Sequence, residues 1–406
     1  MSEQPQISPM SEPPRTKFIT FSLYFLLVFG SIAILQPYLN LHFQAIGFTG
    51  TQIGMVVTIS SLAIILFAPT YGQWFDRSPY KRQVLVFTTL LAMVTMALVP
   101  SLGIFLAVVL LYSINSVITT FNISAVQNIT YQVGSSEGGR NDFGRIRLWG
   151  SLGFAFVVLL GGLIYEKLGV MVNVWIFIAL SLALVIVLLR MPATYFQLSS
   201  SNDEADLGLG GVLKLILKNR FLWMTVVALA LTDPVMDGVR SFEPVIMKNL
   251  GMTESVIGLS TMLSALFEVP LMLRVDRIIA RQGYRKVLIF IFVFDLTRRM
   301  VVWLFPVGMN IFVMTILNCV SLSLRMFTMV SLVNQYIPKR FTTTVYAFFS
   351  VTLTGLGYML SNALSGMIYD NYGGRQVFLM GALLCAVSLL LAVAAGKPSS
   401  DATSAA

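Results

Sequence analysis

The stretch IGFTGTQIGM, residues 46–55, returns as LGMTESVIGL at residues 250–259. At one common offset of 204 residues the two copies share these matches: Gly47 with Gly251, Thr49 with Thr253, Ile53 with Ile257, and Gly54 with Gly258. A second pair of similar stretches, DRSPYKR from Asp76 and DRIIARQGYRK from Asp276, follows the two copies. The sequence therefore predicts two halves with the same order of elements.

The chain is too apolar for a soluble protein. Of its 406 residues, 56% are hydrophobic and 11% are charged, whereas soluble domains carry about 25% charged residues. Continuous apolar runs of roughly 20 residues, the length at which a helix crosses about 30 Å of hydrocarbon, favour helices over the short alternating strands of a β-barrel. Twelve such runs lie at 18–40, 52–74, 83–101, 104–131, 147–168, 170–190, 221–246, 254–273, 286–305, 309–335, 343–369 and 375–396. We therefore predict an all-α integral membrane protein with twelve transmembrane helices.

The basic residues indicate the orientation of these helices. If both termini lie inside, 20 of the 27 Lys and Arg residues fall on the inner side, three fall outside and four fall within spans. Cytoplasmic loops collect basic residues, so we expect both termini in the cytoplasm and the protein in the plasma membrane. The net charge of +9 is then a topology signal and not a nucleic-acid footprint.

The longest polar connection divides the spans six and six. We expect a disordered tail at 1–17, a first six-helix bundle at 18–190, a central cytoplasmic loop at 191–220, a second bundle at 221–396, and a tail at 397–406. Two similar bundles, parallel about an axis along the membrane normal, can rock around a site held between them and open it to one side at a time. This architecture is typical of a carrier.

One motif in the first half resembles a known family. GQWFDRSPYKR, residues 72–82, resembles the signature of the major facilitator superfamily after the second span, and its degenerate copy has Met272 in place of the glycine. The resemblance covers nearly the whole chain and implies that superfamily's two-bundle fold. A carboxylate near a helix N-terminus and neighbouring arginines can hold the inner side closed; otherwise the basic residues only set the topology. The expected gating residues are Gly72, Asp76, Arg77, Arg82, Asp276 and Arg277.

A narrower resemblance lies in FGRIRLWGSLGF, residues 143–154. It is similar to the start of the fifth span in the proton-coupled oligosaccharide, nucleoside and phenylpropionate permease group, to which lactose permease belongs. The resemblance implies that Arg147 contacts the solute. Asn128 and its neighbour Gln127 lie where the group's sugar symporters have an acidic residue, and Phe154 replaces their stacking tryptophan.

The second half places charges inside its apolar runs. In LTDPVMDGVRSFEP, residues 231–244, Asp233, Asp237 and Arg240 fall within a helical sector of about 60°. An ionised group at the bilayer centre costs about 2.5–3.5 kcal/mol, so such charges must face protein or water. They are either structural ion pairs, such as one between Asp295 and Arg299, or they include a carboxylate that binds a proton reversibly. The whole set is Asp233, Asp237, Arg240, Glu243, Glu268, Asp295, Arg298, Arg299 and Arg325, with Asp233 and Asp237 as the leading proton sites and Asp295 next.

The first half carries neutral polar groups instead. Such groups can hydrogen-bond a solute, or they can hold helices together. The expected solute-binding residues are Tyr24, Gln36, Asn40, Asn115, Asn122, Asn128, Arg147 and Phe154.

The sequence contains no catalytic or nucleotide-binding pattern. One histidine, two unpaired cysteines and no P-loop argue against an enzyme, an ATP-driven pump, and a bound metal or cofactor. The leading hypothesis is a monomeric secondary active transporter that moves a sugar, nucleoside or aromatic acid across the lipid bilayer by symport with protons. The alternatives are a proton-antiporting exporter of drugs or metabolites and a transport-inactive sensor on a carrier scaffold.

Overall fold

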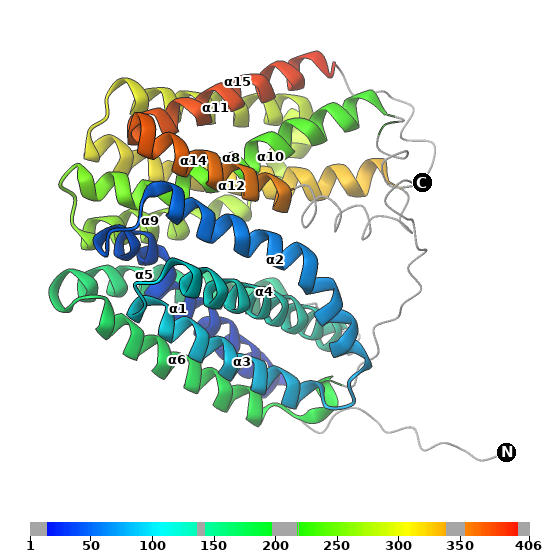
Figure 1. The fold of residues 1–406 in the computed structure, drawn as a ribbon. Helices are drawn as coiled ribbons and strands as arrows, with labels where there is room; N and C mark the ends of the chain where they lie inside the picture. Colours follow the sequence, from blue (N-terminus) through cyan, green and yellow to red (C-terminus); the bar gives the residue numbers. More distant parts are fainter. Residues whose placement is uncertain (1–13, 136–142, 197–216, 218, 338–353, 397–406) are drawn as a thin grey trace.

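The computed structural model describes residues 14–135, 143–196, 217, 219–337 and 354–396, without the side chains of 14–15, 134–135, 233–237, 276, 330 and 334. Within these ranges the chain consists almost entirely of long helices (Figure 1). The first half contains α1 (Pro14–Ala45), α2 (Gly50–Arg77), α3 (Lys81–Leu98), α4 (Phe105–Ser135), α5 (Phe143–Leu168) and α6 (Val170–Arg190), with short turns η1 (Val99–Ser101) and η2 (Ala193–Phe196). The second half contains α8 (Arg220–Asn249), α9 (Glu254–Met272), α10 (Val275–Gln282), α11 (Tyr284–Leu304), α12 (Gly308–Tyr336), α14 (Thr354–Tyr372) and α15 (Gly374–Ala394).

Nine helices of the described ranges are long and apolar enough to cross a membrane: α1 to α6, α9, α12 and α15. Helix α11 is of similar length but contains five charged residues. Helix α8 has an apolar part at Arg220–Thr232, and α14 is described from Thr354 onward. The predicted all-helical class is confirmed, while the number of spans and the orientation of the termini stay predictions.

The two halves pack in the same way. In the first half α1 packs on α5 and α6, α2 on α4, and α3 on α4 and α6. In the second half α8 packs on α14 and α15, α9 on α12, and α11 on α12 and α15. Between the halves α2 lies along α14, α5 along α9, and α1 against α8 (Figure 1). Each interface helix therefore has a counterpart in the other half.

The repeated sequence forms equivalent turns. Gly47 and Gly251 have φ angles of 94° and 82°, a left-handed conformation that glycine adopts without a steric penalty. Thr49 and Thr253 then precede α2 and α9 as N-cap residues. We call the helix ends that carry these turns the turn end of the molecule, and the opposite ends, which carry Arg77 and Arg190, the basic end.

The hydrophobic core divides toward the basic end. At the turn end one buried cluster contains residues of both halves, including Leu35, Val158, Phe242 and Ile257. Toward the basic end a separate cluster around Phe25 lies within the first half, and another lies within the second half. The halves are thus joined at the turn end.

Two features differ from the expected domain bounds. Helix α1 begins at Pro14, so the last four residues of the expected tail at 1–17 are helical. The short helix α10 joins α9 to α11 where the sequence analysis placed only a connection. Most of the expected central loop at 191–220 lies outside the described residues.

Candidate functional site: a cavity between the two halves

A cavity of about 380 Å³ lies between the halves toward the turn end. The first half lines it with Asn40 and Tyr112, and the second half lines it with Glu243, Asn318 and Asn362. The amide of Asn40 also crosses the interface and donates a 2.8 Å hydrogen bond to the carbonyl of Ser241. Small-molecule sites have this size and a few converging polar groups.

A wider cavity of about 920 Å³ continues toward the basic end. It reaches Phe143 at the start of α5 and Leu273 just after α9. The residues that line both cavities are Gln36, Phe154, Arg240, Thr261 and Ser264. The two spaces therefore form one path from the middle of the molecule to its basic end.

Four charged side chains line the wide cavity, and one of them, Arg145, is an exposed residue near its opening at the basic end. Arg147 comes from α5 in the first half, while Arg240 and Glu268 come from α8 and α9 in the second. Glu268 is the carboxylate whose charge acts on the Arg147 guanidinium, and Arg240 and Arg147 are the cations whose charges act on Glu268. One carboxylate that lines a cavity together with two arginines can bind polar solute groups while the charges compensate one another.

The Arg147 side chain is held against aromatic rings of α1. Its guanidinium carbon lies 4.1 Å from the ring centre of Phe29 and 5.9 Å from that of Phe25. Gly150 leaves the space for this arrangement, because a Cβ atom there would lie 2.7 Å from the Phe29 ring and 2.9 Å from Arg147 Nη1. These cation–π contacts orient the guanidinium at the cavity wall.

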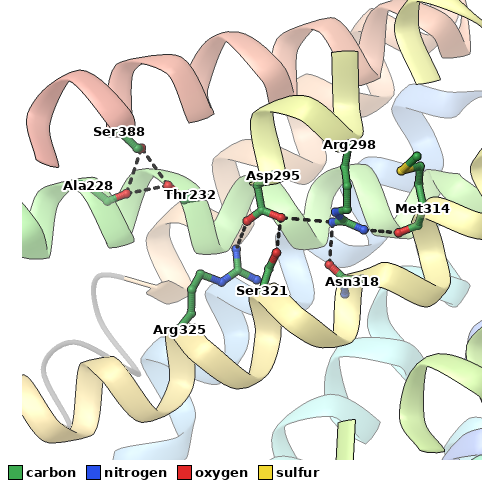
Figure 2. A network of polar contacts seen from close by, with 9 residues as sticks. All are labelled: Ala228, Thr232, Asp295, Arg298, Met314, Asn318, Ser321, Arg325 and Ser388. Carbon is green, nitrogen blue, oxygen red and sulfur yellow. Dashed lines mark hydrogen bonds and ion pairs between the residues drawn. The ribbon is translucent and has the colours of Figure 1, made fainter. Parts of the chain in front are cut away.

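A second set of charges is buried between α11 and α12 (Figure 2). The Asp295 carboxylate is fully buried and lies 3.3 Å from Arg298 Nη2 and 3.4 Å from Arg325 Nη1. Ser321 donates a 2.5 Å hydrogen bond to the same carboxylate. Buried charges need such partners because the surrounding helices offer no water.

Among the described residues, Asn318 links this buried network to the 380 Å³ cavity. Arg298 donates to the carbonyl of Met314 and, at 2.8 Å, to the amide oxygen of Asn318 (Figure 2). Asn318 lines the cavity near the turn end. A change in the charge of Asp295 can therefore reach the cavity through Arg298 and Asn318.

A third cavity, of about 290 Å³, lies within the first half and is lined by Tyr24, Asn115 and Asn122. Asn122 hydrogen-bonds to the hydroxyls of neighbouring helices, and Asn115 donates 2.8 Å to the carbonyl of Ala92. Gln36 lines all three cavities and donates to the Tyr112 hydroxyl at 3.4 Å. It thus lies where the side cavity meets the central path.

The comparisons with known proteins identify the family. A model described as the MFS_1 like family matches residues 18–380. The chain belongs to this family. It is therefore a member of the major facilitator superfamily (MFS), a multi-pass membrane protein that transports solutes, and not an enzyme.

Several known proteins resemble this MFS transporter over more than nine-tenths of its length. It is 26% identical over 391 residues to a maltose permease of Geobacillus stearothermophilus, covering 93% of this chain and 94% of the permease. An uncharacterized transporter of Bacillus subtilis (strain 168), YwbF, is 20% identical over 375 residues, covering 91% of each chain. Crystal structures with the same fold include the nucleoside transporter NupG, with a TM-score of 0.81, 18% identity and coverage of 94% of this chain and 100% of NupG. A bacterial homologue of the human lysosomal transporter Spinster, inward-facing and occupied, has a TM-score of 0.75, 12% identity and coverage of 97% and 99%.

The structure brings most of the expected solute-binding residues of this MFS transporter together. Those that line the three cavities are Tyr24, Gln36, Asn40, Asn115, Asn122, Arg147 and Phe154. Asn128 lies elsewhere, in a smaller pocket near the basic end that also contains Asp76 and Lys81. It accepts a 3.3 Å hydrogen bond from Gln132 on its own helix.

The second-half charges separate into two groups. Arg240, Glu243 and Glu268 line the cavities, whereas Asp295, Arg298 and Arg325 form the buried network. Arg299, also buried, packs on α15, where a Cβ at Gly381 would lie 2.7 Å from its Nη1. Arg299 was the example partner expected for Asp295, and the ion pairs described for this carboxylate are with Arg298 and Arg325. The side chains of Asp233 and Asp237 lie outside the described residues.

The expected gating residues lie at the basic end. Gly72 faces Phe121 of α4, which a Cβ would approach to 3.3 Å. Asp76, Arg77 and Arg277 are exposed, and Arg82 donates a 3.2 Å hydrogen bond to the carbonyl of Met191. The side chain of Asp276 lies outside the described residues.

Sequence reasoning missed two carboxylates at the turn end, Glu166 and Asp370. Each accepts hydrogen bonds from the other half of the molecule. A signal was available, because Tyr165-Glu166 and Tyr369-Asp370 are again 204 residues apart. Thr261, Ser264 and Asn318 were also missed, since a lone hydroxyl or amide in an apolar helix is a common structural feature.

Proposed function

We propose that this transporter is a proton-coupled symporter for a small, neutral, polyhydroxylated solute of the sugar or nucleoside class. The observation that supports it most is the lining of the connected cavities. Amides and hydroxyls from both halves line the middle of the path together with the aromatic ring of Phe154, and Glu268 lines the wide cavity together with three arginines. The names of two similar proteins, a maltose permease and a nucleoside transporter, agree with this class.

The proposal includes an orientation. If the basic end lies in the cytoplasm, as the distribution of Lys and Arg predicts, the structure is a state whose cavity opens to the cytoplasm. The halves would then separate at the turn end to receive solute from outside, in a monomer at the plasma membrane.

Solute binding can be tested with the purified protein. A panel of sugars, nucleosides and aromatic acids should contain a neutral hydroxylated compound that raises the melting temperature. Arg147→Ala and Arg147→Lys should both abolish this stabilisation, because a lysine cannot reproduce a planar guanidinium stacked on Phe29. Arg190→Ala, a change of an exposed arginine, is the matched control. Stabilisation by aromatic acids alone would contradict the proposed solute class.

We further propose that Glu268 carries the transported proton. It lines the same cavity as Arg147 and Arg240, whose charges act on it, so protonation of this carboxylate can free the two guanidinium groups to bind the solute. Asp233 and Asp237, the leading proton sites in the sequence analysis, remain candidates.

The coupling proposal separates gradient-driven accumulation from solute exchange. Glu268→Gln should lose accumulation under a pH gradient and keep exchange of internal for external solute. Asp233→Asn and Asp237→Asn are tested in parallel. Glu254→Gln serves as the control. Glu254 does not line the described cavities, and its carboxylate lies 2.8 Å from Lys248 Nζ. Unchanged accumulation in Glu268→Gln would exclude this residue as the proton site.

A further inference from the structure

The internal repeat extends into the contacts that join the halves at the turn end. On α5, Tyr165 and Glu166 are followed by Gly169; on α14, Tyr369 and Asp370 are followed by Gly373 at the same offset of 204. The two glycines have φ angles of 81° and 84°. The ends of α5 and α14 are therefore built alike, and each carries a carboxylate in its last turn.

The first of these carboxylates binds the start of α2. Asp370 of the second half accepts hydrogen bonds from the backbone N–H groups of Gly50 and Thr51, both at 2.7 Å, and from the Thr51 hydroxyl at 2.6 Å. The first N–H groups of a helix have no partner within the helix. Asp370 supplies one from the opposite half, where the helix dipole also favours a negative charge.

The second carboxylate makes the equivalent contact with the halves exchanged. Glu166 of the first half accepts a 3.1 Å hydrogen bond from the backbone N–H of Ser255 and another from the Ser255 hydroxyl. Ser255 stands 204 residues after Thr51, and Asp370 stands 204 residues after Glu166. Two equivalent carboxylates thus bind two equivalent helix starts across the interface.

Close backbone crossings lie beside both contacts. A Cβ at Gly366 would lie 2.3 Å from the carbonyl oxygen of Gly50, and a Cβ at Gly162 would lie 2.4 Å from that of Glu254. These glycines are one helical turn before Asp370 and Glu166. They let the helices approach closely enough for the carboxylates to reach the opposite half.

We propose that Glu166 and Asp370 form two equivalent clamps that hold the turn end closed, and that both must release for the cavity to open at that end. The clamps are suited to reversible release, because the carboxylates and the N–H groups lie at helix ends where water can solvate them after separation. This inference rests on one part of the proposed function, alternating access, in which the cavity opens to one side of the membrane at a time. It does not depend on the identity of the solute or of the coupling ion.

The clamps can be tested by a distance measurement between spin labels. Cysteines replace Ile46 and Leu250, exposed and equivalent positions in the two turns, in a Cys319→Ser, Cys385→Ser background. The parent protein in lipid nanodiscs should show mainly a short label distance. Glu166→Ala or Asp370→Ala should each raise the ratio of long to short distances about fivefold, and the double variant about 25-fold, if each clamp is worth a typical helix cap.

Two further variants make the outcome decisive. Glu254→Ala also removes a carboxylate at the turn end, but this carboxylate pairs with Lys248 of its own half. The variant should therefore leave the distances between the spin labels unchanged. Gly162→Leu combined with Gly366→Leu places side chains against the opposing carbonyls and should give an open reference. An unchanged distribution in the double clamp variant, or equal opening by Glu254→Ala, overturns the clamps. If the open reference also stays short, alternating access at this end is overturned as well.

Discussion

Asp295 is the residue on which the buried charge network of the second half depends. Replacing it with Asn leaves Arg298 and Arg325 buried without this carboxylate. We expect Asp295→Asn to lower the free energy of unfolding by about 3–5 kcal/mol, measured by thermal denaturation. Ser321→Ala, which removes only a hydrogen bond to the same charged carboxylate, should cost less, about 1.5–3 kcal/mol. Equal losses in the two variants would contradict this account of the network.

Gln36 occupies the junction of all three cavities. We expect Gln36→Leu to weaken solute binding about tenfold or more, because a solute group then meets an apolar side chain in place of an amide. Folding should be unaffected, since the only described hydrogen bond of this side chain is a long one to Tyr112. Calorimetric titration measures the affinity, with Tyr112→Phe as the comparison. Unchanged affinity would place Gln36 outside the solute contacts.

The sequence alone identified residues whose charge would be energetically costly in contact with lipid. Charges within apolar runs had to face protein or water, and Glu268 and Asp295 do so in the structure. The same argument could not identify the partners of Asp295, because the rotation of α11 against α12 depends on packing. It also missed Glu166 and Asp370, since a charge at a helix end costs little.

At the level of elements, the packing of α1 on α5 depends on glycine. A Cβ at Gly153 would lie 2.5 Å from the carbonyl oxygen of Leu26, which is backbone and cannot move aside. We therefore expect Gly153→Ala to destabilise the protein by about 1–3 kcal/mol, measured as a lower melting temperature. Gly103→Ala, with no atom within 4 Å of the new Cβ, should have no effect. Equal stability of the two variants would contradict the close crossing.

Helix boundaries were predictable where the apolar run and the helix coincide. The expected span 170–190 matches α6, and 254–273 matches α9 to one residue. Helix α10 was not predicted, because eight residues with polar and apolar sides give no membrane signal. The start of α1 was set too late because a membrane helix can extend beyond its apolar run.

At the scale of the whole molecule, the path between the halves reaches the basic end. A cysteine at Ser264, which lines both central cavities, should react with a membrane-impermeant maleimide faster in inside-out vesicles than in right-side-out vesicles. The background again lacks Cys319 and Cys385. Faster labelling from the opposite side would reverse the predicted orientation of the termini.

The duplication was the one global property visible in the sequence, since matched turns at an offset of 204 imply matched helices. The conformation of the transporter could not be predicted from the sequence, because nothing in a single sequence indicates at which end two similar bundles are in contact. The central claim, that the halves form a proton-coupled carrier, is tested most directly by flux into proteoliposomes under an imposed pH gradient. We predict that the solute that stabilises the protein accumulates on the alkaline side and that a protonophore abolishes this accumulation. Accumulation on the acidic side, or the absence of any flux, would contradict the account.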